Sequence, residues 1–137
     1  MIYESDENRL AERICAWVFE RRGFDAVVSP TKTLWDIALS QDGVPHALVE
    51  YKCREERFDP YYIDATKIDG LIDISVRHNV SPWLVVEWPC GYWVWEAEKG
   101  YPTKKFRREK RRGMSGETRD TEDIVYCIPL KAFRKIP

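Results

Sequence analysis

Two short apolar runs, Leu34-Trp-Asp-Ile-Ala-Leu39 and Ala47-Leu-Val-Glu-Tyr-Lys52, decide the fold of this chain, together with the segment Ser40-Gln-Asp-Gly43 between them. An Asp-Gly pair between two such runs is a strong short-range signal for a β-hairpin. In that hairpin, Asp36 on the first strand and Glu50 on the second would lie close together. Side chains two residues apart on a strand share a face, so Lys52 points to the same side as Glu50.

Two carboxylates and one ammonium group at one point have a specific chemical use. Carboxylates supply the hard oxygen ligands that Mg²⁺ prefers, and a cation meets the negative charge that develops on a phosphate under attack. The triplet alone leaves a second interpretation open, in which Glu50 and Lys52 form an ion pair or a solvated strand end. For Asp36 that alternative is weaker, because an ionised acid among apolar neighbours costs several kcal/mol unless it is paired or metal-bound.

Length and composition predict one globular domain over residues 1–137. The chain is 44% apolar and 13% aromatic, which is typical of a folded protein. Its apolar runs fall well short of the roughly 18 residues that a membrane span needs, and the acidic start does not resemble a signal peptide. We therefore expect a cytoplasmic protein that does not enter a membrane. Four widely spaced cysteines, with no Cys-x-x-Cys pair, predict neither a disulfide framework nor a zinc site.

The formal net charge of −1 conceals a strongly basic segment. Residues 104–112 hold seven basic residues and one acid, so they carry +6 and the remaining chain carries −7. A local positive potential binds a polyanion even when the whole protein is acidic. We therefore predict DNA contacts here, with a merely solvated segment as the alternative; the basic residues are Lys104, Lys105, Arg107, Arg108, Lys110, Arg111 and Arg112.

Apolar periodicity and turn residues predict an α/β fold in the order αβββαβββα, a mixed sheet with helices on its faces. The first helix, over 6–22, has its main apolar stripe at Leu10, Ile14, Trp17 and Val18, with a weaker stripe at Cys15, Ala16 and Phe19. The crossover helix between the second hairpin strand and the next apolar run makes those two strands parallel. The remaining predicted elements are strands at 24–29, 34–39, 47–52, 83–88, 93–95 and 123–128, helices at 61–78 and 129–133, and a basic loop at 99–116.

Four segments together resemble the PD-(D/E)XK nuclease superfamily, and within it most closely the archaeal Holliday junction resolvases. Ala11-Glu-Arg13 stands eleven residues before Gly23-Phe24, as in the first helix of those resolvases. Trp35-Asp-Ile-Ala-Leu39, followed fourteen residues after its acid by Glu50-Tyr-Lys52, resembles their metal-binding hairpin. The other matching segments are Tyr62, Lys67 and Gly70-Leu-Ile-Asp73 in the next helix and Cys127-Ile-Pro-Leu-Lys-Ala-Phe133 at the end.

The resemblance implies a role for each matching residue. Asp36 and Glu50 would be the paired ligands of Mg²⁺ or Mn²⁺, with the backbone carbonyl of Tyr51 as a further ligand. Lys52 would position the attacking water and stabilise the transition state. Glu12 would hold a water at the metal; the spacing to the Gly-Phe pair favours it over Glu7. Lys67 stands where relatives place a Gln or Lys near the site, and we predict that it contacts DNA.

This chain also departs from the resolvase pattern. Trp35 replaces the proline that gives the superfamily its name, and Thr31-Lys-Thr33 stands where resolvases have a serine. The expected activity is that of a Mg²⁺- or Mn²⁺-dependent DNA endonuclease, selective for branched DNA. A superfamily nuclease for flapped, nicked or duplex DNA, or a non-catalytic DNA-binding module, is the alternative. Four tryptophans, at 83, 88, 93 and 95, are expected in the core or at the interface of a homodimer.

Overall fold

The computed structural model describes residues 6–31, 34–97, 103–112 and 118–137, and for residues 6, 103–112 and 118–123 it describes the backbone only. Two helices and nine strands form the described part, with one short 3-10 helix near the end. In chain order they are α1 (Asp6–Glu20), β1 (Asp25–Val28), β2 (Ile37–Gln41), β3 (Val44–Cys53), β4 (Tyr61–Asp64), α2 (Ala65–Arg77), β5 (Ser81–Trp88), β6 (Gly91–Glu96), β7 (Thr103–Arg112), β8 (Thr118–Ile128), η1 (Leu130–Ala132) and β9 (Arg134–Lys135).

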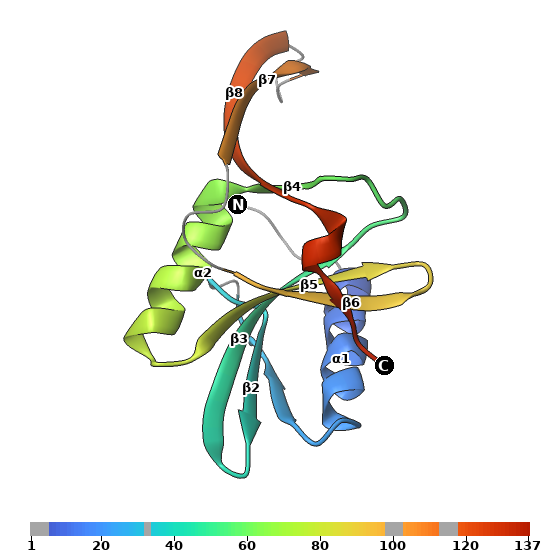
Figure 1. The fold of residues 1–137 in the computed structure, drawn as a ribbon, viewed down its shortest axis with the longest axis vertical. Coiled ribbons are helices and arrows are strands. Elements are labelled where there is room, and N and C mark those ends of the chain that lie inside the picture. The colour runs from blue at the N-terminus through green and yellow to red at the C-terminus, as the bar shows by residue number, and fades with distance from the viewer. Residues whose placement is uncertain (1–5, 32–33, 98–102, 113–117) are drawn as a thin grey trace.

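A six-stranded sheet in the order β1-β2-β3-β5-β6-β9 forms the centre of the fold. β3 and β5 run parallel, as the sequence predicted, while the other neighbours in this sheet are antiparallel. Figure 1 shows α1 and α2 on either side of the β2–β3 hairpin. The predicted α/β class, a mixed sheet flanked by helices, is confirmed.

The predicted hairpin forms around its Asp-Gly pair. β2 ends at Gln41 and β3 begins at Val44, and these two residues are paired. The two residues between them, Asp42 and Gly43, have φ angles of 52° and 78°. Positive φ at both positions is the type I′ geometry, whose twist matches that of the flanking strands. The turn therefore fixes the pairs next to it, Gln41 with Val44 and Ser40 with Pro45, and an irregularity between Leu39 and Ser40 shifts the register of the remaining pairs by one residue.

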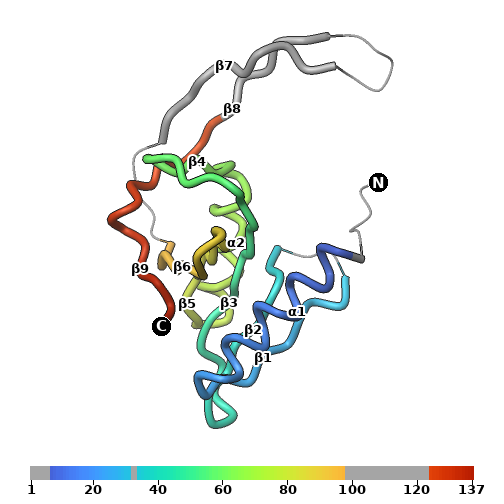
Figure 2. The backbone as a smooth tube through the Cα atoms, turned by 90° about the vertical axis from the view of Figure 1, so that its right-hand side faces the viewer, coloured from blue at the N-terminus to red at the C-terminus, as the bar shows by residue number. Residues whose placement is uncertain are grey.

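The predicted burial of α1 is wrong in one respect. Its weaker stripe, Cys15, Ala16 and Phe19, is buried against the sheet, with exposures of 0–5%. The stripe that looked stronger is exposed: Leu10 at 58%, Ile14 at 46% and Trp17 at 53%. Figure 2 shows α1 lying along β1 and β2. Both stripes are apolar, so periodicity alone does not tell which one the sheet covers.

Two other predicted elements need correction. The helix predicted over 61–78 begins only at Ala65, because residues 61–64 form β4 and pair with β8. The side chain of Asp64 then caps α2 by accepting a hydrogen bond of 2.9 Å from the Thr66 N–H, as an N-cap acid does. The predicted basic loop is also wrong for residues 103–112, which form β7 and pair with β8. The rest of that loop lies outside the described residues.

The core is divided by the six-stranded sheet. On the α1 face, Cys15 and Phe19 pack with Ile37, Val49 and Val85. On the other face, residues of α2, β4 and β8 pack against β5 and β6. The tryptophans Trp88, Trp93 and Trp95 are 1%, 7% and 3% exposed, so the prediction of a core position is confirmed for these three. The fourth, Trp83, is only half-buried. Within the described residues, α1 and α2 are both too short or too polar to span a bilayer.

Candidate active site

Asp36 lies immediately before β2 and is held by backbone hydrogen bonds from both neighbouring strands. Its N–H donates to the Val49 carbonyl at 2.7 Å, and its carbonyl accepts from the Ser29 N–H at 2.8 Å. Its carboxylate Oδ2 accepts a hydrogen bond of 2.8 Å from the Tyr51 N–H. That bond places the Asp36 carboxylate against β3, beside Glu50, the residue that precedes Tyr51.

Glu50 is 6% exposed, which is rare for an acid. Burial, then the charge of the adjacent Asp36 and a hydrogen bond with it, raise the pKa of Glu50 from 4.5 to about 7. The charges of Lys52 and Lys67 lower that pKa and partly offset the increase. Lys52 Nζ lies 3.6 Å from Glu50 Oε2. The structure therefore brings together the two acids and the lysine that the sequence predicted.

Lys67 approaches from α2. The residue is exposed, yet its charge lowers the pKa of Glu50. Since Glu50 pairs in register with Leu84, which packs in the core on the α2 face, both lysines lie on that side of the sheet. The site is consequently a pair of carboxylates with two ammonium groups beside it.

Glu12 reaches the same end of the sheet from α1. It is 6% exposed, and its Oε1 lies 3.9 Å from Arg9 Nη1. The same Arg9 atom donates to the Ser29 carbonyl at 2.8 Å, and Ser29 is hydrogen-bonded to Asp36. The competing acid, Glu7, is exposed. Burial therefore agrees with the sequence spacing in favouring Glu12.

The electrostatics of Cys15 also link Glu12 to Asp36. Burial raises the pKa of the Cys15 thiol above its usual value, and the carboxylates of Glu87, Asp36 and Glu12 raise it further. Even so, no three His, Cys, Asp or Glu side chains in the described part of the chain converge to hold a metal ion. Glu12 therefore lies at the same end of the sheet as the pair, linked to it through Arg9 and Ser29, without completing a third carboxylate ligand.

The donor set of the pair fits a hard divalent cation. Two adjacent carboxylates provide oxygen ligands, and their mutual repulsion is what a cation would relieve. Two protein ligands are also enough for Mg²⁺, which usually keeps several waters. The role of the Tyr51 carbonyl as a further ligand stays a prediction.

Sequence reasoning missed Glu87 on β5. The Tyr51 hydroxyl donates a hydrogen bond to its Oε1, and a hydrogen bond with Glu87 also contributes to the raised pKa of Tyr92. These contacts lie on the α1 face, where the Tyr51 side chain is buried. An acid inside the apolar run Trp83–Trp88 was the available signal, because an ionised carboxylate in such a strand needs partners.

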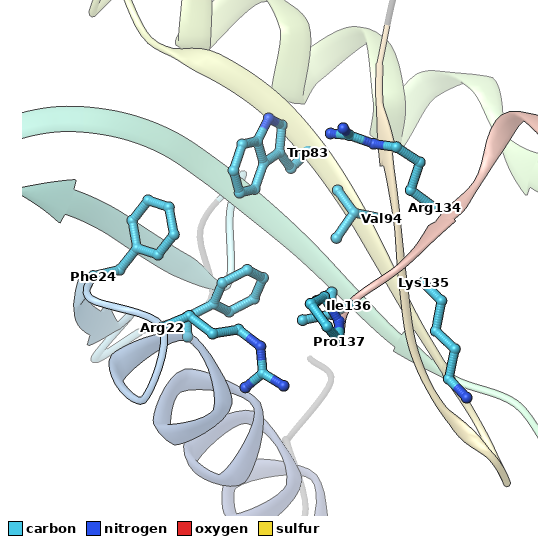
Figure 3. A pocket seen from close by; sticks show the side chains of 9 residues that line it. Arg22, Phe24, Trp83, Val94, Arg134, Lys135, Ile136 and Pro137 are labelled. Carbon is cyan, nitrogen blue, oxygen red and sulfur yellow. The ribbon is translucent and has the colours of Figure 1, made fainter.

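A separate pocket of about 250 Å³ lies on the α1 face, between the end of α1, β5, β6 and the last residues. Phe24, Trp83 and Val94 supply apolar walls. Arg22 and Arg134 also line it, but Figure 3 shows their guanidinium groups pointing in different directions. This pocket therefore gathers no charge at one point, unlike the site on β3.

The side chains of the basic segment lie outside what the structure describes. Residues 104–112 belong to β7, and only their backbone is described. The DNA contacts predicted for its seven basic residues therefore stay a prediction.

A mixed sheet that brings an acid at the start of one hairpin strand to an acid-x-Lys triplet on the next defines the PD-(D/E)XK class of nuclease. A family model described as "Phage putative PDDEXK endonuclease" matches residues 2–136. Because the match spans nearly the whole sequence, the chain belongs to this nuclease family.

Among solved structures, the fold is similar to that of Hjc from Archaeoglobus fulgidus, a Holliday junction resolvase from an archaeal hyperthermophile. The TM-score is 0.55 at 18% sequence identity, over 62% of this chain and 73% of the resolvase chain. This likeness confirms the predicted fold. A search of curated proteins gave no match.

Proposed function

We propose that this nuclease is a divalent-metal-dependent DNA endonuclease whose active centre is Asp36, Glu50 and Lys52. The observation that carries the proposal is the buried carboxylate of Glu50 beside the half-buried Asp36, with a lysine 3.6 Å from Glu50. A fold has little reason to place two like charges side by side at a partly buried site unless a cation joins them, because the arrangement costs stability. Membership of the endonuclease family supports the same conclusion.

The chain's own residues divide the work of hydrolysis. Asp36 and Glu50 hold a divalent cation, Mg²⁺ or Mn²⁺, which when bound supplies Lewis-acid polarisation of the phosphate. Lys52, whose side chain is 23% exposed, offers an ammonium group to the charge that develops on the phosphoryl oxygens. Glu12 orients a water from the α1 side, and the Tyr51 N–H keeps Asp36 in place.

The substrate we propose is DNA with a branched or otherwise irregular structure. The fold shared with an archaeal resolvase supports this choice. Lys67 is a DNA contact beside the centre, and the basic residues of 104–112 are contacts further along the duplex. Each phosphate contact would add close to one unit to the slope of log affinity against log salt concentration.

The proposal is tested with Asp36→Ala. Purified wild type and variant are incubated with Mg²⁺ or Mn²⁺ and either supercoiled plasmid or a synthetic four-way junction. We expect wild type to cut and the variant to lose cutting while keeping its fold by circular dichroism. Cutting of the junction alone identifies a resolvase, and cutting of plasmid, nicked or flapped DNA identifies a broader nuclease. Binding without cutting by wild type in either metal would contradict the enzymatic role.

Pairing through α1 accompanies this proposal. Leu10, Ile14 and Trp17 follow one line on the exposed face of α1, and exposed apolar stripes of this kind mark protein contacts. Glu7 and Arg21 continue the line at its two ends. A two-fold axis at Ile14 would set two helices antiparallel, with Leu10 against the second copy's Trp17 and Glu7 against its Arg21. This complementarity of charge and apolar surface supports a homodimer.

Cysteine cross-linking tests the dimer. The exposed cysteines, Cys53 and Cys90, are first replaced by serine. In that background, Ile14→Cys should form a disulfide with residue 14 of the second copy across the two-fold axis. Val76→Cys, on an isolated apolar position of α2 that is 69% exposed, is the matched control and should not. A monomeric mass by light scattering together with no cross-link at residue 14 would exclude this interface.

A further inference from the structure

A second cavity begins where the catalytic strand ends. Its lining starts at Cys53, directly after Lys52, and continues through the connection to β4, and its volume is about 830 Å³. That falls within the roughly 300–1,000 Å³ of small-molecule sites. Tyr61 also lines the cavity; burial raises the pKa of this tyrosine, the charge of Arg54 lowers it and the charge of Glu50 raises it. The cavity is therefore next to the proposed active centre.

The wall of this cavity is held in place by contacts to the core. The Trp88 indole N–H donates to the Glu56 carbonyl at 2.9 Å. The Arg57 guanidinium stacks over the Trp88 and Trp93 rings, at 5.2 and 4.6 Å from their centroids. Asp59 accepts a hydrogen bond of 3.1 Å from the Leu130 N–H. The wall is thus formed before any ligand binds, which is typical of binding sites.

The lining combines aromatic surface with acidic charge. Phe58 is 64% exposed and Tyr62 is 43% exposed. An aromatic ring left in water on a well-anchored connection has a surface available for stacking. The lining contains three acids, Glu55, Glu56 and Asp59, and one cation, Arg54. That balance disfavours a phosphate and suits an uncharged, flat group with N–H donors.

We propose that this cavity receives an unpaired nucleobase of the DNA substrate, next to the phosphate at the active centre. The inference rests on the proposed DNA endonuclease function. The base stacks on Phe58, and its exocyclic amino group donates to the acids, since adenine, cytosine and guanine all carry such donors. A base that is already unpaired enters at lower cost than one extracted from a duplex. The cavity thereby gives the enzyme a preference for junctions, flaps and mismatches.

The test measures base capture separately from cutting. The probe is 2-aminopurine, whose fluorescence is followed at successive positions around the branch point of a DNA flap. The flaps are titrated with two proteins: Asp36→Asn, chosen to prevent cutting, and Asp36→Asn combined with Phe58→Ala. We expect quenching at one unpaired position with the first protein. Loss of the quenching and about tenfold weaker flap binding are expected on removing Phe58, within the range of a single base–aromatic stack. Val44→Ala, at an apolar position 64% exposed on the hairpin, is the matched control and should change neither.

Two results separate this inference from the proposed function. Quenching that persists without Phe58, or that occurs at no position, overturns the nucleobase site even if wild type cuts DNA. Absence of cutting by wild type in Mg²⁺ and Mn²⁺ overturns the nuclease proposal, whereas Phe58-dependent quenching would still establish the binding site. In the catalytically competent protein, Phe58→Ala should lower flap cutting about tenfold, and the control Val44→Ala should not.

Discussion

Replacing Glu50 with glutamine should stabilise the metal-free protein at alkaline pH. The pKa of Glu50 in the folded protein is raised from 4.5 to about 7, mainly by burial and by Asp36. The folded state therefore holds the proton more tightly than the unfolded chain. The stability that this bound proton contributes is fully present below pH 4.5 and is lost as the pH rises through about 7. Above that range the ionised carboxylate costs the fold about 3 kcal/mol.

The glutamine side chain has nearly the same shape and does not ionise. We therefore expect Glu50→Gln to raise the free energy of unfolding by about 3 kcal/mol at pH 8 and by at most about 1 kcal/mol at pH 5. The pKa of Glu50 used here already includes its ion pair with Lys52. The charge of that lysine lowers the pKa of Glu50, whereas burial and Asp36 raise it. Urea unfolding in the presence of EDTA at the two pH values measures both numbers.

Divalent metal should reverse the order of stability of wild type and Glu50→Gln at pH 8. A cation held by the pair stabilises wild type at pH 8 according to its concentration and affinity, and it should stabilise Glu50→Gln far less. Glu96→Gln, at an exposed position ending β6, is the control and should show no such dependence on pH or metal. If the glutamine variant gains the same stability at pH 5 as at pH 8, the charge repulsion inferred for this pair is wrong.

Three further predictions test other parts of the structure. Lys52→Gln should lower the rate of cutting about 10²- to 10³-fold, as loss of one transition-state charge contact does. The loss of rate caused by Lys67→Gln should be at least tenfold smaller, and single-turnover assays measure both rates. Trp88→Ala should lower the free energy of unfolding in urea by about 3–5 kcal/mol, because the Trp88 side chain is buried, with 1% exposure. Trp17→Ala, measured at low protein concentration, should lower it by less than about 1 kcal/mol. Gly43→Ala should cost about 1 kcal/mol through its φ of 78° alone, since open space surrounds the added methyl group; equal stability of variant and wild type would contradict that strain.

The candidate centre was predictable because its signals are local. The Asp-Gly turn pairs Gln41 with Val44 and so starts the hairpin. A one-residue shift of register between Leu39 and Ser40, which the sequence did not predict, then brings Asp36 beside Glu50. The alternation of strand side chains then assigns Lys52 to the same face. The parallel placement of β5 followed from the intervening helix. None of these steps required knowledge of a contact distant in the sequence.

The errors arose where pairing or packing overrides the local preference of a segment. Residues 61–64 carry helix-compatible periodicity, but pairing of Tyr61 with the distant Ile128 makes them a strand. Residues 103–112 are polar and basic, yet pairing with the next strand, β8, extends them. The two apolar stripes of α1 differ too little for the sequence to decide which one packs against the sheet.

Tyr51 explains why the geometry of the centre depends on the core of the sheet. Its backbone N–H holds the Asp36 carboxylate, and its side chain crosses to the α1 face and is tied to Glu87. Seven register pairs, from Ala47 to Cys53, fix β3 against β5. A slip of one residue would turn Glu50 and Lys52 into the apolar packing under α1, a far costlier arrangement. The same interactions that exclude this slip therefore hold the two acids together.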